Sequence, residues 1–303
     1  RKLQKSAIRA CCDRLVSVGG FKFRRSAFRG DEPKVTLLVP ASFGLSTDSI
    51  PIDFSVNAVS PLHNAALLTE CGQMEPRARE LILLVKRWAK DRGICHAAKG
   101  HLSPYSWALL SIFFLQAGVD DNGSLLPPVA EFKMASGLMG KTNAEQKPAW
   151  STPEGSTKSI GTLFKEFVHF YAKEFDWRKE AISVRVGQRQ TPEVSLSLHI
   201  LENTDGSTQV APSIEDPFDV SKNMSSGMNT ASLARLHEEL KRAAQLCDSS
   251  ASLAALLEPW APPDYDAVDN STDSIKDCDT VPSSPKTDPP LPPWRAQMRA
   301  RVE

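Results

Sequence analysis

The sequence predicts an α+β fold, in which a small sheet precedes a mainly helical region. Apolar residues recur with helical spacing over residues 2–18, and Gly19 and Gly20 end this helix. Segments rich in β-branched and aromatic residues then predict three strands, at 21–27, 35–39 and 50–56. After Pro61 the apolar spacing is helical again, which indicates a second region.

The second region is expected to be built from helices. Their predicted ranges are 62–71, 76–92, 104–117, 160–174 and 229–247. Two further segments, 175–186 and 194–200, are candidate strands. Residues 120–158 have little periodicity and predict a loop. The tail at 251–303 is rich in Pro, Asp and Ser, so we expect it to be disordered.

Composition limits the class of protein. The 303 residues are enough for two domains, and a hydrophobic content of 41% supports their cores. Net charge is zero, but residues 1–34 hold ten Lys or Arg against three acids, which suits phosphate contacts and equally an ordinary solvated face. The longest apolar run, 107–119, is too short to span a bilayer, so no membrane partner is expected. The six cysteines lack metal-binding spacing, which favours reduced thiols in an intracellular compartment.

The most informative stretch is the predicted helix pair within residues 81–116. Lys86 and Lys90 are four residues apart, so they project from one face of the first helix. Ser103 is a good N-cap for the second helix, and Pro104 suits its first position. Two ammonium groups near a helix N-terminus favour a polyphosphate, although lysine pairs on helices are usually solvated surface.

Four blocks of sequence, in this order, carry a resemblance to a known family. They are PIDFSVN at 51–57, PLHNAALL at 61–68, the helix pair at 81–116, and LFKEFVHFYAKEFDW at 163–177 with IEDPFDVSKN at 214–223. Together they resemble the noncanonical poly(A) polymerases and terminal uridylyltransferases of the polymerase-β-like nucleotidyltransferase superfamily. The resemblance implies a partial catalytic palm at 1–60 and a mainly helical central domain at 61–250, which includes the poly(A)-polymerase-associated region.

The resemblance also implies roles for individual residues. Asp53 matches the third catalytic carboxylate, which together with two others holds Mg²⁺ or Mn²⁺ and activates the RNA 3′ hydroxyl. Pattern alone is equally compatible with an exposed strand carboxylate. Tyr105 matches the aromatic residue that stacks on the base, with a core-packed aromatic as the alternative. The remaining nucleotide-binding candidates are Lys86 and Lys90 for the triphosphate, Asn64 for the ribose, Ser103, and Asp216, Asp219 and Lys222 in the recognition loop.

Three residues depart from the family pattern. Ala65 stands where the family often has Ser or Thr, and Pro104 replaces a Ser that often touches phosphate. Lys222 stands where many uridylyl-specific members have His. A lysine only donates hydrogen bonds, so it suits O4 of uracil better than the amino group of adenine. This favours UTP as substrate, with ATP as the alternative.

The first part of the family's catalytic signature is absent from this sequence. A Gly-Ser followed by an Asp-x-Asp should precede the third carboxylate, and neither precedes Asp53. Asp264 and Asp266 form an Asp-x-Asp, but we interpret it as a chance match in the Pro-rich tail. Because the chain also begins with Arg1, we expect the C-terminal part of an enzyme, inactive by itself.

The expected function is therefore transfer of UMP from UTP to RNA 3′ ends. Its expected partners are an RNA 3′ end and a nucleoside triphosphate, with protein partners possible through the tail at 251–303. Three alternatives stay open at this point: a poly(A) polymerase that uses ATP, a noncatalytic RNA-processing subunit of the same fold, and a helical scaffold without a nucleotide site.

Overall fold

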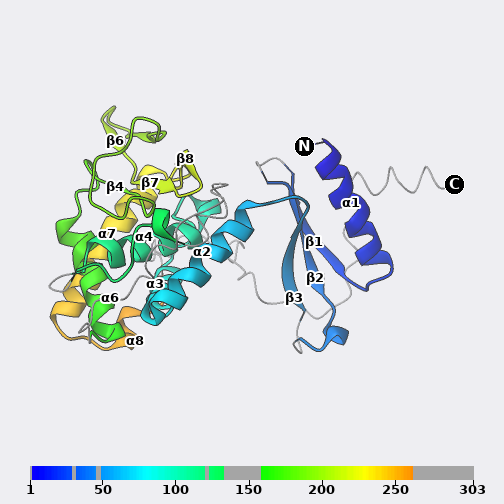
Figure 1. Ribbon diagram of the computed structural model, residues 1–303, viewed down its shortest axis with the longest axis horizontal. Helices are drawn as coiled ribbons and strands as arrows, with labels where there is room; N and C mark the ends of the chain where they lie inside the picture. The colour runs from blue at the N-terminus through cyan, green and yellow to red at the C-terminus, as the bar shows by residue number, and fades with distance from the viewer. Residues whose placement is uncertain (1, 29–31, 46–48, 120–122, 133–157, 262–303) are drawn as a thin grey trace, which may run out of the picture. The chain divides into compact units, whose positions relative to one another are not determined.

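The computed structural model describes residues 2–28, 32–45, 49–119, 123–132 and 158–261. These residues form an α+β structure, as expected (Figure 1). Their buried apolar side chains form two separate clusters. The smaller cluster belongs to a sheet region that runs from α1 to β3. The larger cluster belongs to a helical region that runs from α2 to α8. Each region is described separately below.

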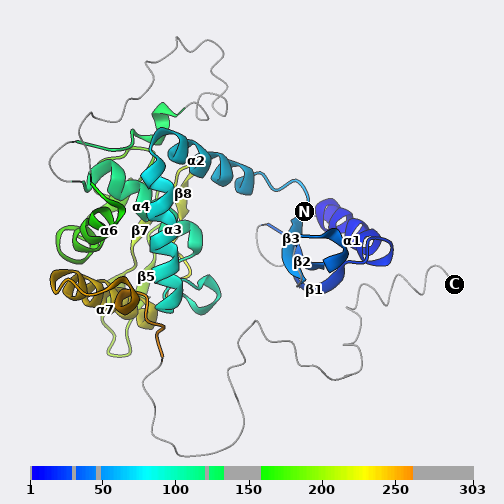
Figure 2. The same ribbon diagram turned by 90° about the horizontal axis from the view of Figure 1, so that it is seen from below.

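The sheet region consists of one helix packed against three antiparallel strands in the order β1-β2-β3 (Figure 2). Its core is formed by Ile8 and Cys12 from the helix and by Val35 and Leu37 from the central strand. Side chains alternate along a strand, so the residues between these face away from the helix. The elements are α1 (Lys2–Ser17), β1 (Lys22–Ala27), β2 (Lys34–Val39) and β3 (Ile50–Ser55), each within a residue or so of its predicted range.

The helical region is organised around α4 (Pro104–Ala117), the most apolar of its helices. Its residues 106–116 are all buried, as expected for a helix that is apolar on every side. Helix α3 packs on α4 and α6, and α6 packs on α7 (Figure 2). The other helices are α2 (Ser60–Met74), α3 (Pro76–Asp91), α6 (Ile160–His169), α7 (Thr230–Asp248) and α8 (Leu253–Leu256), with short 3-10 turns at Ala97–Lys99 and Val129–Glu131. A further 3-10 turn, Ala41–Phe43, joins β2 to β3 in the sheet region.

Capping residues explain where these helices begin. The hydroxyl of Ser103 accepts a hydrogen bond from the backbone N–H of Ser106 at 3.0 Å, which confirms the predicted N-cap of α4. Asn229 and Ser232 form a reciprocal capping box at the start of α7. Helix α6 passes at its end into a π-helical turn, Phe170–Glu174, so the helix predicted at 160–174 is present in two parts.

The strand predictions for the helical region were mostly wrong. Residues 175–186 contain only the two-residue strand β4, because Phe175 and Trp177 pack into an aromatic cluster through a turn instead of a sheet. The real strands are two to five residues long, too short to give a clear period in the sequence. They are β4 (Ala181–Ile182), β5 (Ile200–Glu202), β6 (Thr208–Val210), β7 (Ser213–Asp216) and β8 (Asp219–Asn223), arranged as a β4-β7-β8 sheet and a β5-β6 hairpin.

Ordered structure continues past residue 251, where the tail was expected to begin. Helix α8 follows, and the backbone N–H of Trp260 donates to the carbonyl of Asp91 at 2.8 Å. Residues 262–303, including Asp264 and Asp266, lie outside the described residues, as does much of the predicted loop at 120–158. Within the described part of the chain, no helix is both long and apolar enough to cross a membrane.

Candidate functional site

Asp53 lies on β3, on the face of the sheet opposite α1. Its register partner on β2 is Thr36, whose hydroxyl donates to Asp53 Oδ1 at 2.6 Å. The ammonium group of Lys34 lies 2.6 Å from Asp53 Oδ2, and Arg25 Nε on β1 donates to the Thr36 hydroxyl at 3.3 Å. Burial alone would raise the pKa of Asp53, but the hydrogen bonds from Lys34 and Thr36 outweigh it and hold this pKa below its usual range. The Asp53 carboxylate is therefore ionised, and its negative charge is stabilised by Lys34 and Thr36.

These residues do not by themselves fit a catalytic divalent ion. Both carboxylate oxygens of Asp53 already accept hydrogen bonds, from Lys34 and from Thr36. Across the described ranges, no three His, Cys, Asp or Glu side chains are placed to bind a metal ion together. A two-metal site needs several carboxylate ligands. We therefore derive no catalytic step through a metal ion from this sheet.

Lys86 and Lys90 lie on α3 as the spacing predicted. Lys86 is half-buried and Lys90 is exposed. Both act on Cys95 in the loop that leads to α4: burial raises the pKa of this thiol, and the two ammonium groups partly offset the rise. Both ammonium groups are therefore near enough to Cys95 to act on its charge. Neither lysine forms an ion pair with a described residue, so both charges are available to an anion.

Tyr105 and Asp216 are brought close together, although 111 residues separate them in the sequence. The ring of Tyr105 packs against the edge of the helical core, and its hydroxyl is buried with no hydrogen-bond partner among the described residues. Burial and the nearby Asp216 carboxylate raise the pKa of this phenol far above its ordinary value. Asp216 is buried at the end of β7 and accepts from the backbone N–H of Phe218 at 3.0 Å. The ring of Tyr105 is therefore partly in the core, and its hydroxyl group lacks a hydrogen-bond partner among the described residues.

Asn64 and Ser103 occupy the starts of two helices. Asn64 Oδ1 is buried without a partner among the described residues. Its neighbour His63 contacts Phe218, with ring centroids 5.1 Å apart, so the start of α2 meets the turn between β7 and β8. Ser103 caps α4 and also lies 2.8 Å from the Ser106 hydroxyl, so its oxygen is engaged within the helix start.

Asp219 and Lys222 lie on β8, and both are exposed. Asp219 Oδ1 accepts from the hydroxyl of Ser221 at 2.7 Å and from its N–H at 3.3 Å, so it shapes the β7–β8 hairpin. Lys222 extends from the same hairpin. Both residues belong to the hairpin that carries Asp216, whereas Asp53 lies on β3 in the sheet region.

Sequence reasoning missed two buried ion-pair networks in the helical region. Glu215, next to Asp216, accepts from Ser183 Oγ and Arg185 Nε, each at 2.9 Å. Glu239 on α7 accepts two hydrogen bonds from Arg92, both at 2.9 Å. The partners are 32, 30 and 147 residues apart, so no local spacing could have indicated them.

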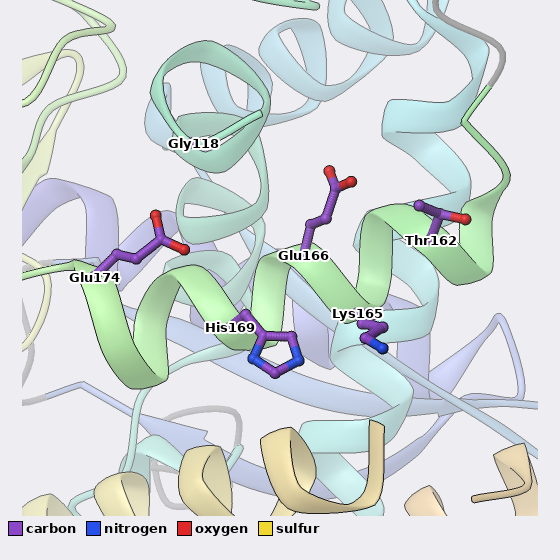
Figure 3. A pocket seen from close by; sticks show the side chains of 6 residues that line it. All are labelled: Gly118, Thr162, Lys165, Glu166, His169 and Glu174. Atoms are coloured by element: carbon purple, nitrogen blue, oxygen red, sulfur yellow. The ribbon is translucent and has the colours of Figure 1, made fainter. Parts of the chain in front are cut away.

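A hollow of about 360 Å³ beside α6 contains none of the predicted site residues (Figure 3). Glu166 and Glu174 extend on one side of the helix, and Lys165 and His169 on the other. Glu166 is paired with Lys158 at 2.8 Å, and His169 Nε2 lies 3.0 Å from Asp248. Because Glu166 and His169 are already paired with other side chains, we do not assign a ligand to this hollow. The lining residues are Gly118, Thr162, Lys165, Glu166, His169 and Glu174.

Comparison with known families and proteins gives consistent matches. Residues 159–222 match the family described as Cid1 family poly A polymerase. The terminal uridylyltransferase cid1 of Schizosaccharomyces pombe is 28% identical over 211 residues, which is 66% of this chain and 51% of that protein. Poly(A) RNA polymerase GLD2-A of Xenopus laevis is 32% identical over 140 residues, which is 45% of this chain and 27% of that protein. The chain therefore spans about half or less of the length of these relatives.

Solved structures share the fold. A Cid1 structure described for its RNA terminal uridylyl transferase activity has a TM-score of 0.66 and 21% identity, covering 86% of this chain and 78% of that one. A Cid1 variant bound to MgATP has the same TM-score at 22% identity, covering 84% and 77%. At this identity the likeness extends to the fold alone, and it agrees with the expected α+β fold.

Proposed function

We propose that the protein transfers a nucleotide from a nucleoside triphosphate to an RNA 3′ end. The reason is that this chain belongs to the noncanonical poly(A) polymerase and terminal uridylyltransferase family of nucleotidyltransferases. In this proposal the helical region binds the nucleotide. The sheet region contributes Asp53 as one of the carboxylates at the reacting end.

The buried hydroxyl of Tyr105, which has no hydrogen-bond partner among the described residues, is the observation that carries this proposal. A buried hydroxyl group without a hydrogen-bond partner lowers the stability of the fold by about 1–3 kcal/mol. A ligand that forms this hydrogen bond would remove the cost. An aromatic ring at the edge of a core offers a face on which a base can stack. Lys86 and Lys90, with no ion-pair partner among the described residues, supply the positive charge that a triphosphate needs.

We propose UTP as the preferred nucleotide. Lys222 is exposed on the hairpin that follows Asp216, where it is free to meet a base edge. Its ammonium group only donates hydrogen bonds, which suits a uracil carbonyl and not an adenine amino group. The matched relatives include uridylyltransferases and poly(A) polymerases, so ATP is the second candidate.

An extension assay tests the proposal. Full-length protein is incubated with a labelled RNA, UTP or ATP, and Mg²⁺ or Mn²⁺. We expect extension with UTP in excess of ATP, none after Asp53→Asn, and at least tenfold weaker nucleotide use after joint Lys86→Ala and Lys90→Ala, since each charge-assisted phosphate contact contributes roughly 1.5–3 kcal/mol. Lys241→Ala, an exposed lysine on α7, is the matched control.

Substantial extension by the folded Asp53→Asn variant would remove Asp53 from the catalytic group. Unchanged UTP and ATP affinity in the folded double-lysine variant would remove the α3 pair from the site. If the wild-type protein uses ATP in preference to UTP, ATP is the substrate, which was the second candidate.

A further inference from the structure

Residues 258–260 form a short segment that lies across the C-terminal end of α3. The backbone N–H of Trp260 donates to the carbonyl of Asp91 at 2.8 Å, and Arg92 donates to the carbonyl of Glu258. The last carbonyls of a helix have no partner within the helix, so an outside donor stabilises the final turn. Lys90 lies in that turn, one residue before Asp91.

Trp260 is 37% exposed, and its ring contacts both Arg235 and the backbone at Gly93. The guanidinium carbon of Arg235 lies 4.7 Å from the ring centroid, in a cation–π contact. Gly93 also lies beside the ring, and it adopts a left-handed conformation with φ of 71°. A Cβ atom at this position would come within 3.1 Å of the ring. Any other residue would therefore be strained there and would also press on Trp260.

A buried ion-pair network joins this segment to α7. Arg92 forms a bidentate pair with Glu239, with both N–O distances at 2.9 Å, and Arg235 donates to the same carboxylate at 2.6 Å. Arg235 also donates to the carbonyl of Arg92 at 3.3 Å. The end of α3, the middle of α7 and Trp260 are therefore fixed to one another.

We propose that Trp260 is a positioning residue for Lys90. Packing of its ring keeps the final turn of α3 helical, and a helical final turn keeps Lys90 on the same face as Lys86. Lys86 lies one turn earlier, where the intrahelical hydrogen bonds are complete, so it does not depend on Trp260. This inference rests on the proposed nucleotide site, in which both lysines meet the triphosphate.

A thermodynamic cycle separates this role from simple stabilisation. Binding of UTP and of ATP with Mg²⁺ is measured by isothermal titration calorimetry on the 303-residue chain, its Trp260→Ala and Lys90→Ala variants, and the double variant. We expect Trp260→Ala to weaken binding about three- to tenfold, as a misplaced phosphate contact should, and to have no further effect when Lys90 is already Ala. A parallel cycle combines Trp260→Ala with Lys86→Ala. There, the fold-changes in Kd caused by the two single substitutions should multiply in the double variant.

Conservative and matched variants complete the test. Trp260→Phe keeps a ring beneath Arg235 and should bind within twofold of the wild type. Leu253→Ala, at a residue 52% exposed on the nearby helix α8, should change nothing. If Trp260→Ala does not fold, Trp260→Leu replaces it in the cycle.

Three outcomes would overturn the inference. In the first, folded Trp260→Ala binds the nucleotide with wild-type affinity while Lys90→Ala binds it weakly. This outcome would refute the role of Trp260 and leave the proposed nucleotide site intact. Another is an equal loss from Trp260→Ala in the presence and absence of Lys90. The third is wild-type affinity in Lys90→Ala, which would remove the proposed triphosphate contact and the inference together.

Discussion

The sheet region and the helical region bury their apolar side chains to very different extents. In the sheet region, the fully buried cluster is Ile8, Cys12, Val35 and Leu37, and one face of the sheet carries charged groups around Asp53. In the helical region, α4 is buried on all sides. Aromatic rings pack between it and its neighbours, such as Trp88 of α3 and Trp107 of α4, whose ring centroids are 5.5 Å apart. Small cores stabilise a fold only marginally. The difference indicates that the helical region sets the stability of the chain, while the sheet region depends on few contacts.

Glu239→Ala should have the largest effect and should act on the helical region. The substitution leaves Arg92 buried without its bidentate partner. An uncompensated buried charge costs about 3–5 kcal/mol. Urea denaturation followed by tryptophan fluorescence should therefore show a large fall in the midpoint. A change under 1 kcal/mol would mean that water reaches Arg92 when its partner is removed.

Leu37→Ala should have a smaller effect, confined to the sheet region. Leu37 lies in the centre of β2 and is fully buried. Loss of a buried leucine side chain costs about 2–4 kcal/mol, depending on how far the site collapses. Because the two clusters are separate, amide hydrogen exchange should speed up in β1–β3 and stay unchanged in α4. Faster exchange in both regions would show that they unfold together.

The dependence of stability on pH should be the smallest effect and should again separate the regions. Burial would raise the pKa of Glu239, but its hydrogen bonds with Arg92 and Arg235 lower it, and the pKa of Asp53 is lowered by Lys34 and Thr36 against its own burial. A carboxyl group with a lowered folded-state pKa stabilises the fold above its unfolded-state pKa, about 4, and loses this contribution as pH falls further.

Glu239 should dominate this loss below pH about 4, because the Lys34–Asp53 pair is roughly half exposed and is screened by solvent. Denaturation midpoints from pH 7 to pH 3 should fall less steeply for Glu239→Gln than for the wild type, and Asp53→Asn should change the slope little. A flatter curve for Asp53→Asn than for Glu239→Gln would reverse the assignment.

Local features of both regions could be predicted from the sequence. Ser103 and Pro104 marked the start of α4, and the alternation of Ile52 and Phe54 marked β3, because capping and strand burial depend on neighbouring residues. The proximity of Tyr105 to Asp216 was not visible in any spacing; only the family resemblance placed both residues in one site. The pairing of Arg92 with Glu239 and the contacts of Trp260 depend on packing between distant segments, which no local pattern records.

The complete burial of α4 has a consequence for how a ligand would meet its first turn. Tyr105 extends from a helix whose following eleven residues have no solvent-exposed face, so the backbone beneath it cannot reorient without disrupting the core. The conformational entropy of that turn is lost when the protein folds, not when a ligand arrives. In the proposed site, such preorganisation would remove one cost of association and leave more of the stacking energy between Tyr105 and a base as affinity. It also limits plasticity, so adaptation to a different base should come from the exposed β8 hairpin and not from Tyr105.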